Sequence, residues 1–282
     1  MSMKRSHVAT PSFGSIAYSE SGTGPVALFV HGVFLSADLW GSQCLGLSDL
    51  RRCIAIDLLA HGGSPLPPGH LTIGVQASMV LEFLDALDIG EVDLVGNDTG
   101  GAVAQIVVAR RPDRVRSLTL TNCDVHDNFP PEAFLPICDL ARQGLLAGGL
   151  VALSGDPSGI RTALLAGFED PEKIPDETLL GFFGGLASEE RAEALQDYVA
   201  GMEPSEMVAI RDDLARFVRP TLVVWGTDDV FFPVRWVDWL EATIPGVGHT
   251  VRIEGARLFF PLERPEALND ALREFWTVRP RR

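Results

Sequence analysis

Asp98 is the residue whose type and setting point most clearly to chemistry. It follows the largely apolar run 92–95, stands inside the stretch GNDTGG at 96–101, and precedes a helical pattern at 102–109. Glycines at 96 and 100 tolerate the backbone angles of a tight, strained turn, in which a Cβ would clash. Such a turn between a strand and a helix raises the side chain at its apex above the sheet, so we predict that Asp98 is presented as a nucleophile. An ordinary turn in which Asp98 only caps the helix is the alternative.

The turn at Asp98 lies within an alternation of strands and helices. Short apolar runs typical of buried strands occur at 26–30, 53–57, 118–122 and 221–225, and a last strand is expected at 250–254. Helical spacing predicts helices at about 72–87, 233–243 and 265–276, and a hairpin is expected from 7–10 and 15–19. This alternation predicts an α/β fold whose mostly parallel sheet is covered on both faces.

The alternation stops between residues 123 and 214. This stretch is predicted to be helical, with helices at roughly 131–143, 176–183 and 188–202. We interpret it as a cap inserted at the carboxyl edge of the sheet, where open α/β sheets bind ligands. The predicted domains are therefore a core of residues 1–122 and 215–282 and a helical cap of residues 123–214.

Composition excludes several classes of function. The chain has 282 residues, 46% of them hydrophobic, and a net charge of −15, which disfavours nucleic acid and anionic membranes as partners. The longest apolar run, 145–153, is too short to span a bilayer, and no signal peptide is recognised. The four cysteines show no metal-binding spacing and are expected to be reduced and buried. These features predict a cytoplasmic protein.

Four landmarks together resemble the α/β-hydrolase fold. They are His31-Gly32 after a strand, DLLAHGGS at 57–64, the GNDTGG turn at 96–101 and WGTDD at 225–229. An aspartate at the apex of the turn is similar to the haloalkane dehalogenase and epoxide hydrolase branch rather than to the serine esterases. The resemblance implies a mostly parallel, twisted sheet of about eight strands, with helices on both faces and an inserted helical cap.

The resemblance also implies a chemistry for Asp98. A carboxylate there can displace a leaving group or open an epoxide, which leaves an ester on the enzyme. Water must then hydrolyse this ester with the help of a general base, usually a His that a second acid orients. In this fold the second acid commonly stands three residues after the Gly that follows a strand. That position selects Asp229, with Asp228 as the fallback.

Backbone N–H groups next to the nucleophile are expected to form an oxyanion hole. The donors predicted by position are Thr99 together with Val33 or Phe34. His31 and His61 lie in the loops that carry these groups, and we interpret both as structural residues that shape the loops.

The general base is missing from its usual place. In this fold the His follows the last strand and precedes a helix that starts with Pro-Glu. Aligning the corresponding stretch, 254–266, puts Leu258 at the position of the His, and leucine moves no proton. This is the most informative departure of the sequence from the fold's pattern.

Two other histidines are candidates for a relocated base. His126 follows the strand at 118–122, which is expected to neighbour the strands that carry Asp98 and Asp229. It is therefore the first candidate, and a solvated loop histidine is the competing interpretation. His249 lies in a Gly-x-Gly-His sequence but falls at the amino end of the last strand, away from the site.

The substrate pocket is predicted to be apolar, because aromatic residues gather in loops at the carboxyl edge. The predicted lining residues are Trp40, Phe231, Phe232, Phe259 and Tyr198. The resemblance to specific enzymes is weaker. The haloalkane dehalogenases that this chain resembles carry His-Gly-Asn and Asp-Trp at the halide site, and this chain has Val33 in place of the Asn and Thr99 in place of the Trp. The epoxide hydrolases that this chain resembles carry a His-Gly-x-Pro turn and two cap tyrosines. This chain has Phe34 in place of the Pro, and Tyr198 is the only tyrosine in its predicted cap.

We therefore predict a small-molecule hydrolase that acts on an apolar substrate, with the bond cleaved (carbon–halogen, epoxide or ester) left open. No cofactor or metal is expected, and a homodimer is an open possibility. One alternative is a ligand-binding relative that does not turn over or does so slowly, and another is a cofactor-free lyase or isomerase with Asp98 as base. A metal site through Asp98, Asp124, His126 and Asp229 also remains, although no compact ligand motif supports it.

Overall fold

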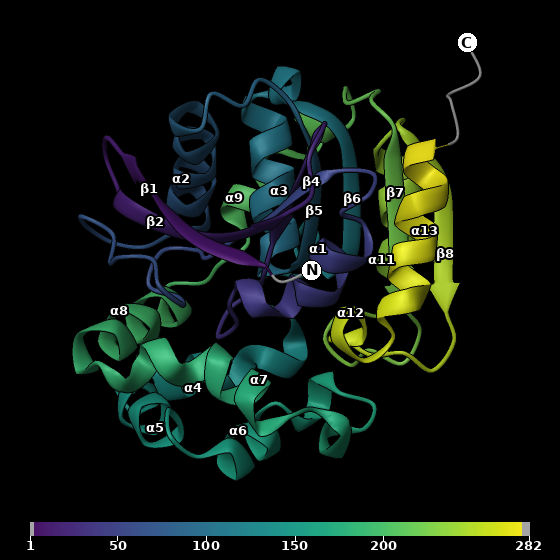
Figure 1. The fold of residues 1–282 in the computed structure, drawn as a ribbon. Helices are drawn as coiled ribbons and strands as arrows, with labels where there is room; N and C mark the ends of the chain where they lie inside the picture. The colour runs from purple at the N-terminus through teal and green to yellow at the C-terminus, as the bar shows by residue number, and fades with distance from the viewer. Residues whose placement is uncertain (1–2, 278–282) are drawn as a thin grey trace.

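The computed structural model describes residues 3–277 and is built around one eight-stranded sheet (Figure 1). The strand order is β1-β2-β4-β3-β5-β6-β7-β8. Only the pairings of β2 with β1 and with β4 are antiparallel, and all the others are parallel. The strands are β1 (Lys4–Thr10), β2 (Gly14–Ser21), β3 (Val26–Val30), β4 (Arg52–Ile56), β5 (Val92–Asp98), β6 (Val115–Cys123), β7 (Thr221–Gly226) and β8 (Val247–Ile253).

Helices pack on the sheet in two groups. In one, α2 (Ile73–Ala86) packs on α3 (Thr99–Arg110), and α3 contacts β5 and β6. In the other, α1 (Gly41–Gly46) packs on α13 (Pro265–Thr277), and α13 contacts β7 and β8. The short helices α11 (Arg235–Thr243) and α12 (Phe260–Glu263) complete this part of the chain. The predicted α/β class and the predicted eight strands are confirmed.

The turn between β5 and α3 has the geometry that its glycines predict. Every residue of β5 is buried, and Asp98 at its end adopts φ 55° and ψ −135°, a conformation that is strained for a side chain with a Cβ. The turn packs closely on its neighbours. A Cβ at Gly96 would lie 2.5 Å from the carbonyl oxygen of Gly100, and a Cβ at Gly100 would lie 2.2 Å from that of Val30 in β3. The glycines therefore let α3 start directly against the sheet.

The helices between β6 and β7 lie together beyond one end of the sheet (Figure 1). They are α4 (Leu135–Arg142), α5 (Leu146–Leu153), α6 (Pro157–Ala163), α7 (Asp176–Phe183) and α8 (Glu189–Ala200). The sequence patterns did not predict α5 and α6 as helices. After them come α9 (Ser205–Ala209) and α10 (Arg211–Leu214), and α10 packs on α3 of the core. The division into a core and a cap at residues 123–214 remains a prediction.

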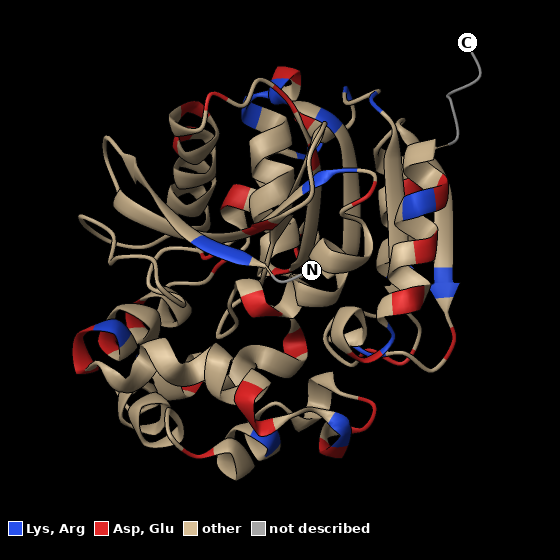
Figure 2. Cartoon of the chain, in the orientation of Figure 1, with Lys and Arg blue, Asp and Glu red and all other residues tan. Residues whose placement is uncertain are grey.

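Charged residues lie on α2, α7, α8 and α13, whereas α5 carries none (Figure 2). Within residues 3–277, no single helix is long and apolar enough to cross a bilayer. The segments Glu132–Arg142 and Leu146–Leu153 reach the length and hydropathy of a membrane span only together, and the chain bends by 102° between them. The four cysteines are buried and form no disulfide, as the sequence analysis expected.

We expect Gly100→Ala to destabilise the protein, because the new methyl group would overlap the backbone of β3. The free energy of unfolding should fall by about 2 to 3 kcal/mol, measured by urea denaturation. Gly148→Ala in α5 is the matched control. Nothing lies within 4 Å of its added Cβ, so it should leave stability unchanged or raise it slightly. Equal stability of the two variants would contradict the close approach of α3 to β3.

Candidate active site

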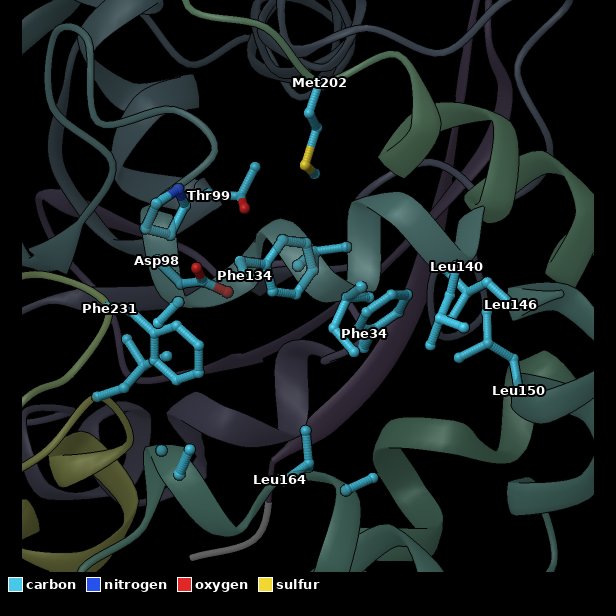
Figure 3. Close-up of a pocket in the computed structure, with 18 of the residues that line it drawn as sticks. Phe34, Asp98, Thr99, Phe134, Leu140, Leu146, Leu150, Leu164, Met202 and Phe231 are labelled. Atoms are coloured by element: carbon cyan, nitrogen blue, oxygen red, sulfur yellow. The ribbon is translucent and has the colours of Figure 1, made fainter. Parts of the chain in front are cut away.

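A cavity of about 430 Å³ lies where the turn at Asp98 meets the helices between β6 and β7. Its polar lining consists of Asp98, Thr99 and Asp124, and the other lining residues are apolar or glycine. Figure 3 shows Asp98 and Thr99 on one side of the cavity and the leucines of α4 and α5 on the other. Leu140 and Leu145 line the cavity although 41% and 59% of their surface is exposed, which marks the mouth between α4 and α5.

The carboxyl group of Asp98 is buried at the floor of this cavity and is 8% exposed. Backbone N–H groups of Thr99 and Val33 hydrogen-bond to it. Gly32 makes room for it, because a Cβ at that position would lie 2.0 Å from Asp98 Oδ2. Burial, followed by the like charge of Asp229, raises the pKa of Asp98 to about 8. The two N–H donors oppose this rise because they stabilise the carboxylate.

Asp229 lies behind the cavity wall, in the loop after β7. Its Oδ2 accepts a hydrogen bond from Asn122 Nδ2 at 2.7 Å, and its Oδ1 accepts one from the N–H of Phe231 at 2.8 Å. Burial raises the pKa of Asp229 to about 6, while these donors lower it. The neighbouring Asp228 is exposed and does not share this environment. Asp229, and not Asp228, is the acid whose charge helps to raise the pKa of Asp98.

Leu258 occupies the wall of the cavity near these two acids. It is 4% exposed and lines the cavity, whereas Asp229 does not. Its carbonyl oxygen accepts a hydrogen bond from Asn97 Nδ2 at 3.2 Å, which ties the loop after β8 to the turn before Asp98. This hydrogen bond holds the backbone at position 258 beside the turn, and the side chain there has no proton to move.

A third acid, Asp124, faces the same cavity just after β6. It is 1% exposed, and its backbone N–H donates to the carbonyl oxygen of Asp98 at 3.4 Å. Within residues 3–277 its Oδ1 has no hydrogen-bond partner. Burial, followed by the like charge of Asp98, raises the pKa of Asp124 well above its ordinary value, and a hydrogen bond with the Thr99 side chain opposes the rise.

None of the chain's six histidines lines the cavity. His126 was expected near Asp98, but it does not line the cavity. Its ring stacks on Trp239 of α11, with ring centroids 4.9 Å apart. His249 is exposed in the edge strand β8, which begins earlier than predicted. His7 and His70 are exposed as well.

His31 and His61 are buried loop residues, as interpreted from the sequence. The Nε2 of His31 accepts from the N–H of Leu58 at 3.0 Å. The Nε2 of His61 accepts from the N–H of Phe34 at 3.2 Å. Burial lowers the pKa of His31 to about 4 and that of His61 to about 3, so both rings stay neutral. Since His61 occupies the N–H of Phe34, the donors that reach Asp98 are those of Val33 and Thr99, and Phe34 contributes only its side chain to the cavity.

The aromatic residues predicted for the pocket divide into two groups. Phe231 and Phe259 line the cavity. Trp40 and Phe232 do not, because both are buried in the core, where Trp40 packs on Phe29. Tyr198 lines a second cavity of about 340 Å³, which shares the lining residues Phe129 and Met202 with the first.

The sequence analysis gave no catalytic or positioning role to Asn97, Asn122 or Asp124. Each of them lies at the end of β5 or β6 or just beyond it, and this position at the carboxyl edge was the available signal. Among residues 3–277, no group of three or more His, Cys, Asp or Glu residues is arranged to hold a metal ion. The four residues of the metal alternative therefore do not form a site in this structure.

The chain is similar to known proteins over most of its length. A family model described as "Alpha/beta hydrolase family" matches residues 27–271. "Haloalkane dehalogenase 2" of Mycobacterium tuberculosis is 31% identical over 278 residues, which cover 93% of this chain and 91% of that protein. A haloalkane dehalogenase of Mesorhizobium japonicum is 39% identical over a shorter stretch of 105 residues, which covers 37% of this chain and 34% of that protein.

Solved structures share the fold over nearly the full length. The epoxide hydrolase CorEH superimposes with a TM-score of 0.82 at 19% identity, covering 97% of this chain and 98% of that one. The haloalkane dehalogenase DatA from Agrobacterium tumefaciens gives a TM-score of 0.82 at 23% identity, covering 98% of this chain and 97% of that one.

The raised pKa of Asp98 predicts a pH-dependent stability. The folded state keeps a proton that the unfolded chain releases, so the contribution of Asp98 to stability falls as the pH rises from about 4 to about 8. We expect Asp98→Asn to equal the wild type in stability near pH 4. At pH 9 it should exceed the wild type by an amount on the order of 3 kcal/mol. Urea denaturation across this range measures the difference. The exposed Asp127→Asn is the control, and a difference for Asp98→Asn that stays constant with pH would contradict the assignment.

Proposed function

The chain belongs to the alpha/beta hydrolase family, and from this premise we propose that it is a hydrolase of small apolar molecules in which Asp98 is the nucleophile. The observation that carries the proposal is the position of Asp98, on a strained turn at the floor of an apolar cavity and within reach of two backbone N–H donors. The names of the relatives support a substrate with a carbon–halogen bond or an epoxide.

In the first step, a carboxylate oxygen of Asp98 attacks a carbon atom of the substrate and forms an ester. Attack requires the ionised form of Asp98, and the N–H groups of Val33 and Thr99 favour this form. The same two donors are placed to stabilise the oxyanion that develops when water later attacks the ester carbonyl. The apolar walls of the cavity take up the rest of the substrate.

In the second step, water hydrolyses the ester, and this step is expected to be slow. Leu258 stands where a general base would be, and no histidine lines the cavity. A general base typically contributes about 100-fold or more to such a step. The ester should therefore accumulate during turnover.

One observation favours a second candidate function. With a pKa of about 8, Asp98 can both accept and donate a proton near neutral pH. This property suits a cofactor-free lyase or isomerase, in which Asp98 moves a proton and forms no bond to carbon. The two candidates differ in whether a covalent intermediate exists.

We expect hexyl bromide, hexene oxide or phenyl acetate to leave a covalent adduct on Asp98, detected by intact mass and located by peptide mapping. Asp98→Asn should show no adduct, since an amide oxygen is a far weaker nucleophile. Turnover of a substrate without any adduct would favour the lyase. Neither adduct nor turnover with any of the three compounds would favour a ligand-binding protein.

We expect Leu258→His to shorten the lifetime of the adduct by about tenfold or more, because an imidazole at this position can deprotonate water beside Asp229. The decay of the adduct after removal of free substrate, followed by mass spectrometry, measures this effect. Leu258→Met is the control, because it nearly keeps the volume of the side chain and adds no base. Equal lifetimes in the two variants would show that position 258 does not reach the ester.

A further inference from the structure

We propose that Asp124 is the acid–base partner of Asp98, and that this pair makes epoxides the preferred substrates of the cavity. The proposal rests on the proposed function, since it requires Asp98 to be the nucleophile. It assigns a catalytic role to a side chain at the end of β6, and it narrows the substrate class.

The position of Asp124 carries the argument. Asp98 and Asp124 both line the cavity, and the backbones that carry them are joined by a hydrogen bond of 3.4 Å. Thr99, the residue after the nucleophile, hydrogen-bonds to the side chain of Asp124 and so orients it. Oδ1 of Asp124 is buried and has no partner within residues 3–277. A buried carboxyl oxygen without a protein donor is poorly stabilised as an anion, which favours the protonated form of Asp124 beside the cavity.

Two carboxyl groups in one desolvated site do not both ionise readily. Burial raises the pKa of both groups; the like charge of Asp229 adds to the rise at Asp98, and those of Asp98 and Asp229 add to the rise at Asp124. Both groups therefore retain protons more readily than ordinary carboxyl groups near neutral pH. The N–H donors of Val33 and Thr99 favour the charged form of Asp98, so Asp98 ionises before Asp124 as the pH rises. The result is a nucleophilic carboxylate next to a carboxylic acid.

This arrangement matches the opening of an epoxide. Asp98 attacks a ring carbon and forms the C–O bond of the ester while the ring C–O bond breaks. The proton of Asp124 passes to the ring oxygen as its bond electrons return to it, which gives a neutral hydroxyl group. Asp98 is then esterified and uncharged, so Asp124 loses its like-charged neighbour and becomes an ionised base.

The ionised Asp124 can then serve the second step. It takes a proton from a water molecule whose oxygen attacks the ester carbonyl, and the oxyanion forms at the N–H groups of Val33 and Thr99. When this intermediate collapses, the C–O bond to the substrate breaks. The leaving alkoxide takes a proton from the new carboxylic acid of Asp98. The products are a diol, ionised Asp98 and protonated Asp124, as at the start.

The cavity assists the cleavage of a carbon–halogen bond less than the opening of an epoxide. A departing halide is an anion, and no side chain that lines the cavity carries an N–H donor or a positive charge. The halide would leave into a cavity that is otherwise almost entirely apolar, where an anion is poorly solvated. The epoxide oxygen leaves as a neutral hydroxyl group and avoids this cost.

Tyr198 is the competing proton donor. It is buried in α8, its hydroxyl has no partner within residues 3–277, and the charges of Asp124 and Asp98 contribute to its raised pKa. Its ring, however, lines the second cavity and not the one that contains Asp98. The geometry therefore favours Asp124.

The test compares two substrates that share a six-carbon chain but differ in their need for a proton. The rate at which hexene oxide or hexyl bromide alkylates Asp98 is measured by quenched-flow mass spectrometry on the full chain. In Asp124→Asn, labelling by hexene oxide should fall by about 100-fold, since the acid is lost. Labelling by hexyl bromide should stay unchanged or become faster, because Asp98 ionises more easily. Asp124→Glu should recover part of the epoxide rate, and Tyr198→Phe should leave it within about twofold.

A second readout is the release step. The hexyl ester should persist longer in Asp124→Asn than in the wild type, where it decays slowly. Equal loss of labelling by both substrates, an unchanged epoxide rate, or loss of the epoxide rate in Tyr198→Phe instead would overturn the assignment of Asp124 while leaving Asp98 as nucleophile. Absence of any label on wild-type Asp98 would overturn the nucleophile and this inference together. If Asp124→Asn does not fold by circular dichroism, Asp124→Ser replaces it with the same expectations.

Discussion

The site depends on the burial of three carboxyl groups at the carboxyl edge of one sheet. Asp98, Asp124 and Asp229 follow β5, β6 and β7, which are neighbours in the sheet, and each is less than one-tenth exposed. Charge in such a place is costly unless it is paired or neutralised. Only Asp229 has a full set of donors, from Asn122 and the N–H groups of the following loop. The other two face the cavity, and this shortage of donors is what makes them chemically available.

The parts of this site that follow from local sequence were predictable. The glycines around Asp98 require a tight turn, and the strand before it is apolar, so the position of Asp98 at the apex of this turn could be derived without a structure. Asp229 was preferred over Asp228 by its spacing from Gly226, and the structure buries the first and exposes the second. Both inferences rest on a few consecutive residues whose geometry the backbone determines.

The parts that depend on distant contacts were not predictable. His126 has a φ of 52°, and its ring meets Trp239, a contact between residues far apart in the sequence that turns it away from the cavity. The choice between Val33 and Phe34 as donor depends on His61, which lies 27 residues after Phe34 and occupies its N–H. Tyr198 is in the predicted helix but lines a different cavity, because the packing of the helices between β6 and β7 sets which side of α8 faces each cavity.

The apolar side chain of Leu258 lines the same cavity as Asp98 and Asp124, and no side chain of this lining carries a positive charge. A protonated imidazole at this place would stabilise the negative charge of the acids. Without such a cation, burial and the like charges of neighbouring carboxyl groups raise the pKa values of Asp98 and Asp124. For the proposed hydrolase, such a cavity lacks a histidine base but holds a carboxylic acid near neutral pH. That acid suits substrates whose leaving atom needs a proton better than those whose leaving group departs as an anion.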